Sequence, residues 1–187
     1  MGRTIGIDMK NILNITNGDC AVEIMKKAAI PGAFLPWRDL LHEGPVPAEL
    51  SLEELSKVRA QYIIDRNWGK PQEIIDSFIE RDNVLKSFRK YEKVILWFEH
   101  DLYDQLQIIQ ILDWFHQNWV HQKCADEVEL SIICTEQYLG RLSPEEIKKL
   151  IQYEERITEA HLELSSQAWS AFRSSSPEEW WGLLNTD

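Results

Sequence analysis

The 187-residue sequence lacks the segments that direct a chain into or across a membrane. No apolar run approaches the roughly 20 residues that a membrane helix requires. The chain begins MGRTIGID, which contains no apolar core of the kind found in secretory signals. We therefore expect a cytoplasmic protein that has no contact with a membrane.

Cysteine is scarce. The sequence has three cysteines, Cys20, Cys124 and Cys134, and no CxxC spacing. An odd number without that spacing argues against a disulfide framework or a zinc knuckle, and it fits a reducing cytosol. Cys20 stands near a predicted helix start, where a thiol can become a nucleophile. Free cysteine is more often a small buried residue, and that is what we expect here.

Positive charge is also sparse. Lysine and arginine number 20 against 31 acidic residues, which gives a net charge of −11. The longest basic clusters are the dipeptides Lys26-Lys27 and Lys148-Lys149. A negative field repels a phosphate backbone, so we expect no non-specific nucleic-acid binding. A small-molecule ligand, a metal ion or a basic partner fits this charge better.

The apolar segments that are present alternate with helical ones. Strands are predicted at about 12–15, 33–36, 94–98 and 128–134. Residues 94–98 (VILWF) are continuously apolar, as in a strand covered on both faces. The alternation predicts an α/β fold with a small, mostly parallel, Rossmann-like sheet. We assign residues 11–142 to this domain, with a helical insertion at about 51–91, and residues 143–187 to a helical C-terminal extension.

Polar residues follow each predicted strand, in segments 16–19 (TNGD), 37–39 (WRD) with 42–44 (HEG), 99–101 (EHD) and 135–138 (TEQY). In open α/β sheets, ligands bind outside the carboxyl ends of the strands. A glycine at a helix start lets an anion approach backbone amides, and arginine can clamp a phosphate or carboxylate. The predicted substrate-binding residues are Asn17, Gly18, Asp19, Trp37, Arg38, Asp39, Asp104 and Gln105.

Two simpler explanations compete with this binding site. Asp19 could cap an ordinary βα turn, and Arg38 and Asp39 could form an internal network that pins a long loop. Trp37, in a polar loop, is the candidate for stacking on a flat ligand. Gln105, Gln107 and Gln110 together are also typical of a solvated or edge face of a helix.

Histidine and carboxylate side chains supply the candidate chemistry. Imidazole beside carboxylate suits general acid/base catalysis or a divalent metal such as Zn²⁺ or Mn²⁺. We expect a metal ion, if one is used, on His100 with Glu99, Asp101 or His42. Alternatively, Asp101 only caps a helix, and Glu99 and Asp104 only favour its positive end. The predicted catalytic residues are His42, Glu43, Glu99, His100 and Asp101.

Four motifs resemble a known family. They are 15–19 (ITNGD), 35–39 (LPWRD), 41–47 (LHEGPVP) and 96–106 (LWFEHDLYDQL). Together they look like the signature of an uncharacterised bacterial family, domain of unknown function 1835, over about residues 12–173. The resemblance implies that these loops are the hallmark of the family, but it brings no activity. Members usually have serine at the position of Cys20 and continue past Asp187, which implies that this chain is a shortened version or a fragment.

The sequence therefore predicts a small-molecule enzyme, a hydrolase or transferase acting on a nucleotide-like or phosphorylated substrate. The alternative is a non-catalytic regulatory module that binds a ligand or protein through the same surface. We expect Asp19, Arg38, His42, Glu99 and His100 to surround one pocket. The sequence has no Walker loop, GxGxxG, HExxH or GxSxG motif. The terminal helix with Trp180 and Trp181 is a candidate for self-association.

Overall fold

The structure is a computed structural model that describes residues 11–120 and 128–184. Its centre is a five-stranded sheet with the order β2-β1-β3-β4-β5. The strands are β1 (Ile12–Asn17), β2 (Ala33–Trp37), β3 (Lys93–Glu99), β4 (Glu129–Thr135) and β5 (Glu155–Arg156). The first four run parallel and β5 runs antiparallel to β4. The predicted α/β class with a mostly parallel sheet is confirmed.

The register of the strands brings their carboxyl ends to one edge. Asn17 at the end of β1 pairs with Trp37 at the end of β2, and Glu99 of β3 pairs with Thr135 of β4. The polar segments that follow the four parallel strands therefore start from the same edge of the sheet.

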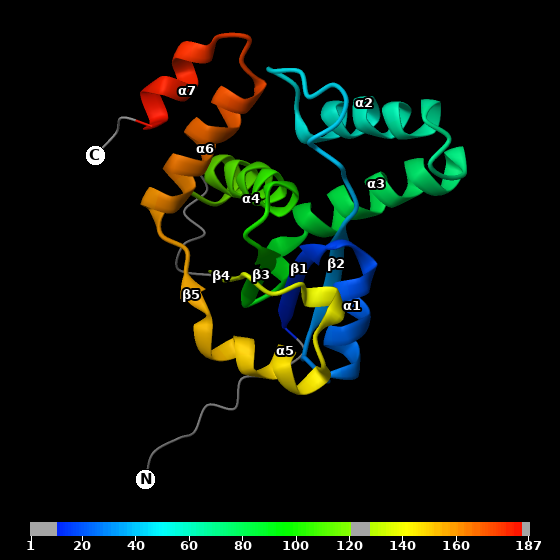
Figure 1. The fold of residues 1–187 in the computed structure, drawn as a ribbon, viewed down its shortest axis with the longest axis vertical. Helices are drawn as coiled ribbons and strands as arrows, with labels where there is room; N and C mark the ends of the chain where they lie inside the picture. The colour runs from blue at the N-terminus through cyan, green and yellow to red at the C-terminus, as the bar shows by residue number, and fades with distance from the viewer. Residues whose placement is uncertain (1–10, 121–127, 185–187) are drawn as a thin grey trace.

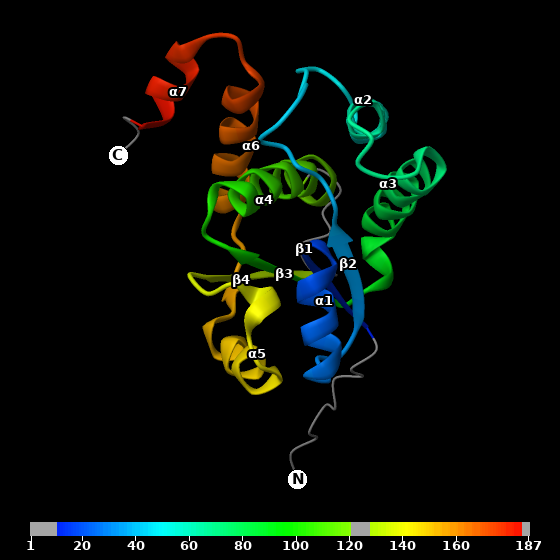
Figure 2. The ribbon, with the colours of Figure 1, turned by 45° about the vertical axis from the view of Figure 1, so that its right-hand side comes forward.

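Helices cover both faces of the sheet (Figures 1 and 2). On one face, α4 (Leu102–Phe115) packs through Ile108, Ile111 and Phe115 in a cluster that also includes Leu162 of α6 (Glu159–Arg173). On the other face lie α1 (Gly18–Lys27) and α5 (Pro144–Leu150). Two-sided burial explains why β3 is apolar along its centre.

The predicted helical insertion is a hairpin of α2 (Leu52–Asp65) and α3 (Pro71–Lys86), which lies beyond β2 (Figure 2). Ser51 and Glu54 form a capping box at the start of α2. The second helix is shorter than predicted. A 3₁₀ turn at Phe88–Lys90 follows Ser87 and leads into β3.

The C-terminal part is not helical throughout, which corrects the prediction. Between α5 and α6, β5 pairs with β4 through Ile132 and Glu155, and the Ile157 amide donates to the Leu130 carbonyl at 2.9 Å. A two-residue strand leaves no periodic signal in the sequence. The chain then forms α6 and α7 (Pro177–Leu184). The predicted domain boundary at residue 142 stays a prediction.

Within residues 11–120 and 128–184, the structure contains no helix with both the length and the apolar character needed to cross a membrane.

A buried carboxylate joins α4 to α6. Asp113 accepts hydrogen bonds from Ser166 Oγ at 2.8 Å and Gln117 Nε2 at 3.0 Å. Burial raises the pKa of Asp113, and these hydrogen bonds and the charge of Arg173 oppose part of that shift. The folded protein therefore holds this proton more tightly than the unfolded chain does, so stability is lost as pH rises through the folded pKa.

The substitution Asp113→Asn should remove the loss of stability that occurs as pH rises, because asparagine has no carboxyl group to ionise. At pH 7 we expect the free energy of unfolding of the variant to exceed that of wild type by on the order of 1 kcal/mol, and its Tm to be higher accordingly. The gain should shrink toward pH 4. Asp76→Asn is the matched control, because Asp76 is exposed and also accepts from a glutamine one helical turn away, at 2.8 Å. A gain for Asp113→Asn that does not change between pH 4 and pH 7 would contradict this explanation.

Candidate functional site

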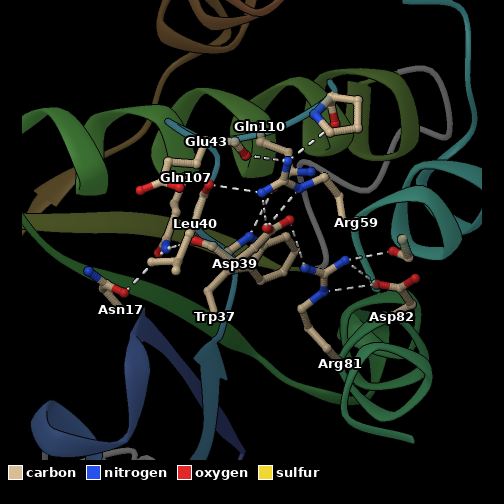
Figure 3. A network of polar contacts seen from close by, with 12 residues as sticks. Asn17, Trp37, Asp39, Leu40, Glu43, Arg59, Arg81, Asp82, Gln107 and Gln110 are labelled. Carbon is tan, nitrogen blue, oxygen red and sulfur yellow. Dashed lines mark hydrogen bonds and ion pairs between the residues drawn. The ribbon is translucent and has the colours of Figure 1, made fainter. Parts of the chain in front are cut away.

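A buried arginine holds the loop between β2 and α2. Arg59 of α2 is fully buried, and its Nε donates to Asp39 Oδ1 at 2.9 Å. The same guanidinium donates to three carbonyl oxygens, those of Leu40 at 2.8 Å, Glu43 at 2.6 Å and Pro45 at 3.2 Å (Figure 3). One buried side chain thus supplies donors to three carbonyl oxygens of the loop. An internal network is therefore observed for Asp39, but its partner is Arg59 and not Arg38 as expected.

A second arginine extends this network to Trp37. The Arg81 guanidinium lies over the Trp37 ring at 4.2 Å and donates to Asp82 Oδ1 and Ser56 Oγ. Arg81 Nη1 is 3.9 Å from Asp39 Oδ2. Trp37 is buried, so the prediction that it stacks on a ligand is wrong. Trp37 is the last residue of β2, and its side chain points into the core between the sheet, α3 and α4.

Amide side chains on α4 tie the strand ends together. Gln107 Nε2 donates to the Asp39 carbonyl at 2.7 Å and to Asn17 Oδ1 at 3.2 Å, and Trp37 Nε1 donates to Gln110 Oε1 at 2.9 Å. Gln107 and Gln110 are buried, so the expectation of a solvated face is wrong for them. Their spacing of three residues puts both on the side of α4 that faces β1 and β2.

Asp104 belongs to the same framework of hydrogen-bonded polar side chains at the strand ends. It is fully buried, accepts a hydrogen bond from Asn17 Nδ2, and accepts another from the Glu99 amide. Burial raises the pKa of Asp104, and these two hydrogen bonds oppose that shift. Asp104 is therefore a structural acceptor between β1, β3 and α4, and the prediction that it contacts a substrate is not supported by its position.

A cavity of about 460 Å³ opens beside this framework, between the carboxyl end of β1 and the α2–α3 hairpin. Four predicted substrate-binding residues line it: Asn17, Gly18, Arg38 and Asp39. The opposite wall comes from the hairpin and is largely apolar. It consists of Ile63, Trp68, Gly69, Lys70, Glu73, Ile74, Ser77 and Phe78, with Leu40 completing the lining.

Two helices begin at this cavity without a side-chain cap. Asn17 and Lys70 are the N-cap residues of α1 and α3, and neither makes a side-chain capping hydrogen bond. The described helices α2, α4, α5 and α6 are all capped by a side chain. The first amides of a helix carry partial positive charge and need acceptors, although α3 lacks the first of them because it begins with Pro71. Gly18 has φ +70° and open space around the position of a Cβ, so the start of α1 is accessible.

Two cationic side chains line the same cavity. Arg38 is held by Asp19 in a bidentate pair, with distances of 2.8 and 2.7 Å, and it donates to Ser77 Oγ at 3.1 Å. The hydrogen bond from Arg38 lowers the pKa of Asp19. Lys70 is exposed and pairs with Glu73 at 2.6 Å. Asp19 does not line the cavity, so its role is to orient Arg38.

The predicted catalytic residues lie elsewhere on the edge of the sheet. None of His42, Glu43, Glu99, His100 and Asp101 lines the cavity, so of the five residues expected around one pocket only Arg38 lies at this one. The cavity lies where the hairpin faces the ends of β1 and β2, whereas Glu99 ends β3 and His100 follows it. Asn17 connects the two regions through its hydrogen bond to Asp104.

Glu99, His100 and Asp101 have separate environments. Glu99 Oε1 accepts from the Leu139 amide at 2.9 Å, and burial raises the pKa of Glu99 against that bond. The Asp101 side chain caps α4 by accepting from the Asp104 amide at 3.0 Å. His100 is exposed. The capping alternative is therefore observed for Asp101. Gln105, half-buried, donates to the Glu99 carbonyl at 3.2 Å.

His42 and Glu43 form a small cluster on the loop. His42 Nε2 is 3.6 Å from Glu43 Oε1, and the His42 ring meets the Tyr103 ring edge-on at 4.2 Å. The buried Nδ1 atom of His42 has no hydrogen-bond partner within the described part of the chain. Glu43 Oε2 lies 3.5 Å from the Tyr62 hydroxyl. An oriented imidazole is present, but no described cavity brings a ligand to it.

The predicted metal ligands are not gathered. Across residues 11–120 and 128–184, no group of three or more histidine, cysteine, aspartate or glutamate side chains could hold a metal ion. His100 is exposed, Asp101 caps α4, and Glu99 accepts from a backbone amide. These side chains and His42 do not fit a metal site.

Cys20 is exposed rather than buried, which corrects the expectation for it. It lies in the first turn of α1, on the side facing the 3₁₀ turn at Leu139–Arg141, and a Cβ at Gly140 would come within 2.9 Å of Cys20 Cβ. Cys20 does not line the cavity.

Sequence reasoning missed the residues that the hairpin contributes. Trp68 and Lys70 stand in a short turn that looked like a mere helix break. Arg59 and Arg81 gave a clearer signal. Arg59 lies four residues after Leu55 and four before Ile63, on the apolar face of α2. A charged residue on a buried face requires a partner, and Asp39 was the available carboxylate.

Comparison of the chain with protein-family models, with curated proteins and with solved structures found no match in any of the three. The resemblance to the bacterial family stays a prediction.

Proposed function

We propose that this chain binds a phosphorylated small molecule in the cavity between β1 and the α2–α3 hairpin. The observation that supports this most is the convergence of two uncapped helix starts on a cavity that also contains Arg38 and Lys70. Backbone amides at helix starts and cationic side chains both favour an anion. The apolar wall would hold the rest of the ligand.

The geometry supports binding better than catalysis. A catalytic group must come within hydrogen-bond reach of the reacting atoms. The predicted acid/base residues do not line the cavity, and Asp39 is engaged by arginine. A hydrolase or transferase reaction by His42, Glu43, Glu99, His100 and Asp101 stays a prediction. Analysis of the bound ligand for products after incubation with the protein would test it.

Removal of the two cationic side chains should weaken binding. Lys70→Gln is expected to lower the affinity for ribose 5-phosphate about 10-fold, because a charge-assisted hydrogen bond contributes about 1.5–3 kcal/mol. Adding Arg38→Gln should weaken binding further, because Asp19 is then left uncompensated near the cavity. Isothermal titration calorimetry at low ionic strength measures both effects.

Lys57→Gln is the matched control. Lys57 also lies on the hairpin but lines a separate groove between α2 and α3. It should bind ribose 5-phosphate like wild type. Equal affinities of wild type and the double variant would show that the phosphate is not bound here, and the proposal would fail.

A further inference from the structure

The turn between α2 and α3 exposes a tryptophan to the cavity. Trp68 is 45% exposed and lines the wall together with Ile63, Ile74 and Phe78. A large aromatic side chain exposed at the mouth of a cavity is a common feature of binding sites for flat ligands, since stacking recovers the apolar area left open. Trp68 thus marks the wall where a planar ring would lie.

The position of Trp68 is fixed by its neighbours. Asn67 has φ +58°, and the Trp68 amide donates to the Ile63 carbonyl at 3.3 Å. The Trp68 ring meets Tyr62 edge-on, with centroids 5.9 Å apart and an interplanar angle of 89°. Asn67 adopts the left-handed conformation that asparagine takes readily at a helix end, and this turn sets the Trp68 side chain beside the cavity.

The loop after β2 in turn fixes Tyr62. Gly44 has φ +80°, and a Cβ there would come within 2.6 Å of Tyr62 Cζ. The guanidinium groups of Arg59 and Arg66 lie 5.3 and 5.0 Å from the centre of the Tyr62 ring. Gly44 thus allows the loop to pack flat on Tyr62, and Tyr62 supports Trp68. A stacking surface that is held before the ligand arrives loses little conformational entropy on binding.

We propose that the ligand is a nucleoside phosphate whose base stacks on Trp68 while its phosphate lies at the starts of α1 and α3. This inference rests on the proposed function and adds the planar base to it. Gly18 and Arg38 line the cavity from the side of β1, whereas Trp68 and Lys70 line it from the hairpin, so the phosphate would lie between the two helix starts and the base against Trp68. A cavity of about 460 Å³ falls within the range of small-ligand sites.

The test compares ligands that differ only in the base. AMP, GMP, CMP and UMP are each titrated into the protein by calorimetry beside ribose 5-phosphate. Stacking on an aromatic side chain is worth about 10- to 100-fold in affinity, so at least one nucleotide should bind that much tighter than ribose 5-phosphate. Trp68→Leu should remove this preference and leave the affinity for ribose 5-phosphate unchanged. Trp68→Phe should keep most of the preference, because a smaller aromatic face remains.

Trp180→Ala controls for the loss of an exposed tryptophan, since Trp180 lies on α7 and does not line the cavity. It should keep the nucleotide preference. Nucleotides that bind no tighter than ribose 5-phosphate would overturn the inference and leave the phosphate site standing. A Trp68→Leu variant that keeps the preference would overturn it in the same way. If neither ribose 5-phosphate nor any nucleotide binds, the proposed function itself fails and the inference fails with it.

Discussion

Replacing Arg59 by methionine is expected to lower the free energy of unfolding by about 3–5 kcal/mol, the usual cost of leaving one member of a buried ion pair without its partner. Methionine keeps much of the volume but none of the donors. Among charged partners Asp39 would keep only Arg81, 3.9 Å away, and the Glu43 and Pro45 carbonyls would lose the arginine donor, whereas the Leu40 carbonyl still accepts from the Glu43 amide. In a chain of this length, the change corresponds to a fall in Tm of about 10 °C or more.

Urea unfolding followed by circular dichroism measures this loss. Arg66→Met is the matched control, because Arg66 follows the same helix and also lies over Tyr62, but it is exposed. It should change stability by less than about 1 kcal/mol. Arg59→Lys should fall between wild type and Arg59→Met, since an ammonium group cannot serve four acceptors in the geometry of a guanidinium. Similar stabilities of Arg59→Met and Arg66→Met would show that the network does not hold the loop.

Trp37→Ala should cost a similar amount, about 3–5 kcal/mol, because it empties a fully buried tryptophan site. The Trp37 side chain is fully buried beneath the Arg81 guanidinium, and its indole nitrogen donates a hydrogen bond to Gln110. Trp37→Phe keeps a ring beneath Arg81 and should cost about 1–3 kcal/mol, since Gln110 Oε1 is left without its donor. Differential scanning calorimetry measures both.

Substitutions of Trp37 and Trp68 should have different effects, since Trp37 belongs to the core and Trp68 to the proposed binding site. Trp37→Phe should lower stability and leave ribose 5-phosphate affinity unchanged, because Trp37 does not line the cavity. Trp68→Leu should change stability by less than about 1 kcal/mol, as is usual for a partly exposed residue. A Trp37→Phe variant that loses affinity without losing stability would restore Trp37 to the binding site.

The fold follows from the sequence to a large extent. Continuous apolar segments were enough to place β1 to β4, and the helical insertion between β2 and β3 was also predicted. Their periodicity is local, so neighbouring residues in the chain contain the signal. β5 could not be found in this way. It is held by pairing with Ser131 and Ile132 of β4, and pairing partners distant in the chain leave no local pattern.

The site could be predicted only in part. Asn17, Gly18, Arg38 and Asp39 were identified because topology places strand ends at one edge. The other wall depends on how the hairpin folds back over that edge, which the sequence does not show. Trp37 illustrates the difficulty. It is followed by polar residues, and only the three-dimensional contacts with Arg81 and Gln110 show that it is buried.

The polar framework explains why the motifs of this edge are so dense in charged residues. Asn17, Asp39 and Glu99 end different strands or begin the loops after them, and α4 connects all three. Gln107 reaches Asn17 and Asp39, whereas Asp104 reaches Asn17 and Glu99. Much of the charge at this edge therefore builds the wall of the cavity, which Arg38, Lys70 and the starts of α1 and α3 also line.

Amide NMR spectra recorded during titration with AMP would show directly whether the ligand occupies this cavity. We expect progressive shifts of the backbone amides of Gly18 and Gly69 and of the Trp68 indole N–H, all of which belong to residues lining the cavity. The amide of Lys57, in the separate groove, should stay unchanged. Shifts confined to His42, His100 and Gln105, with Gly18 and Trp68 unaffected, would place the ligand at the other part of the sheet edge and contradict the proposed site.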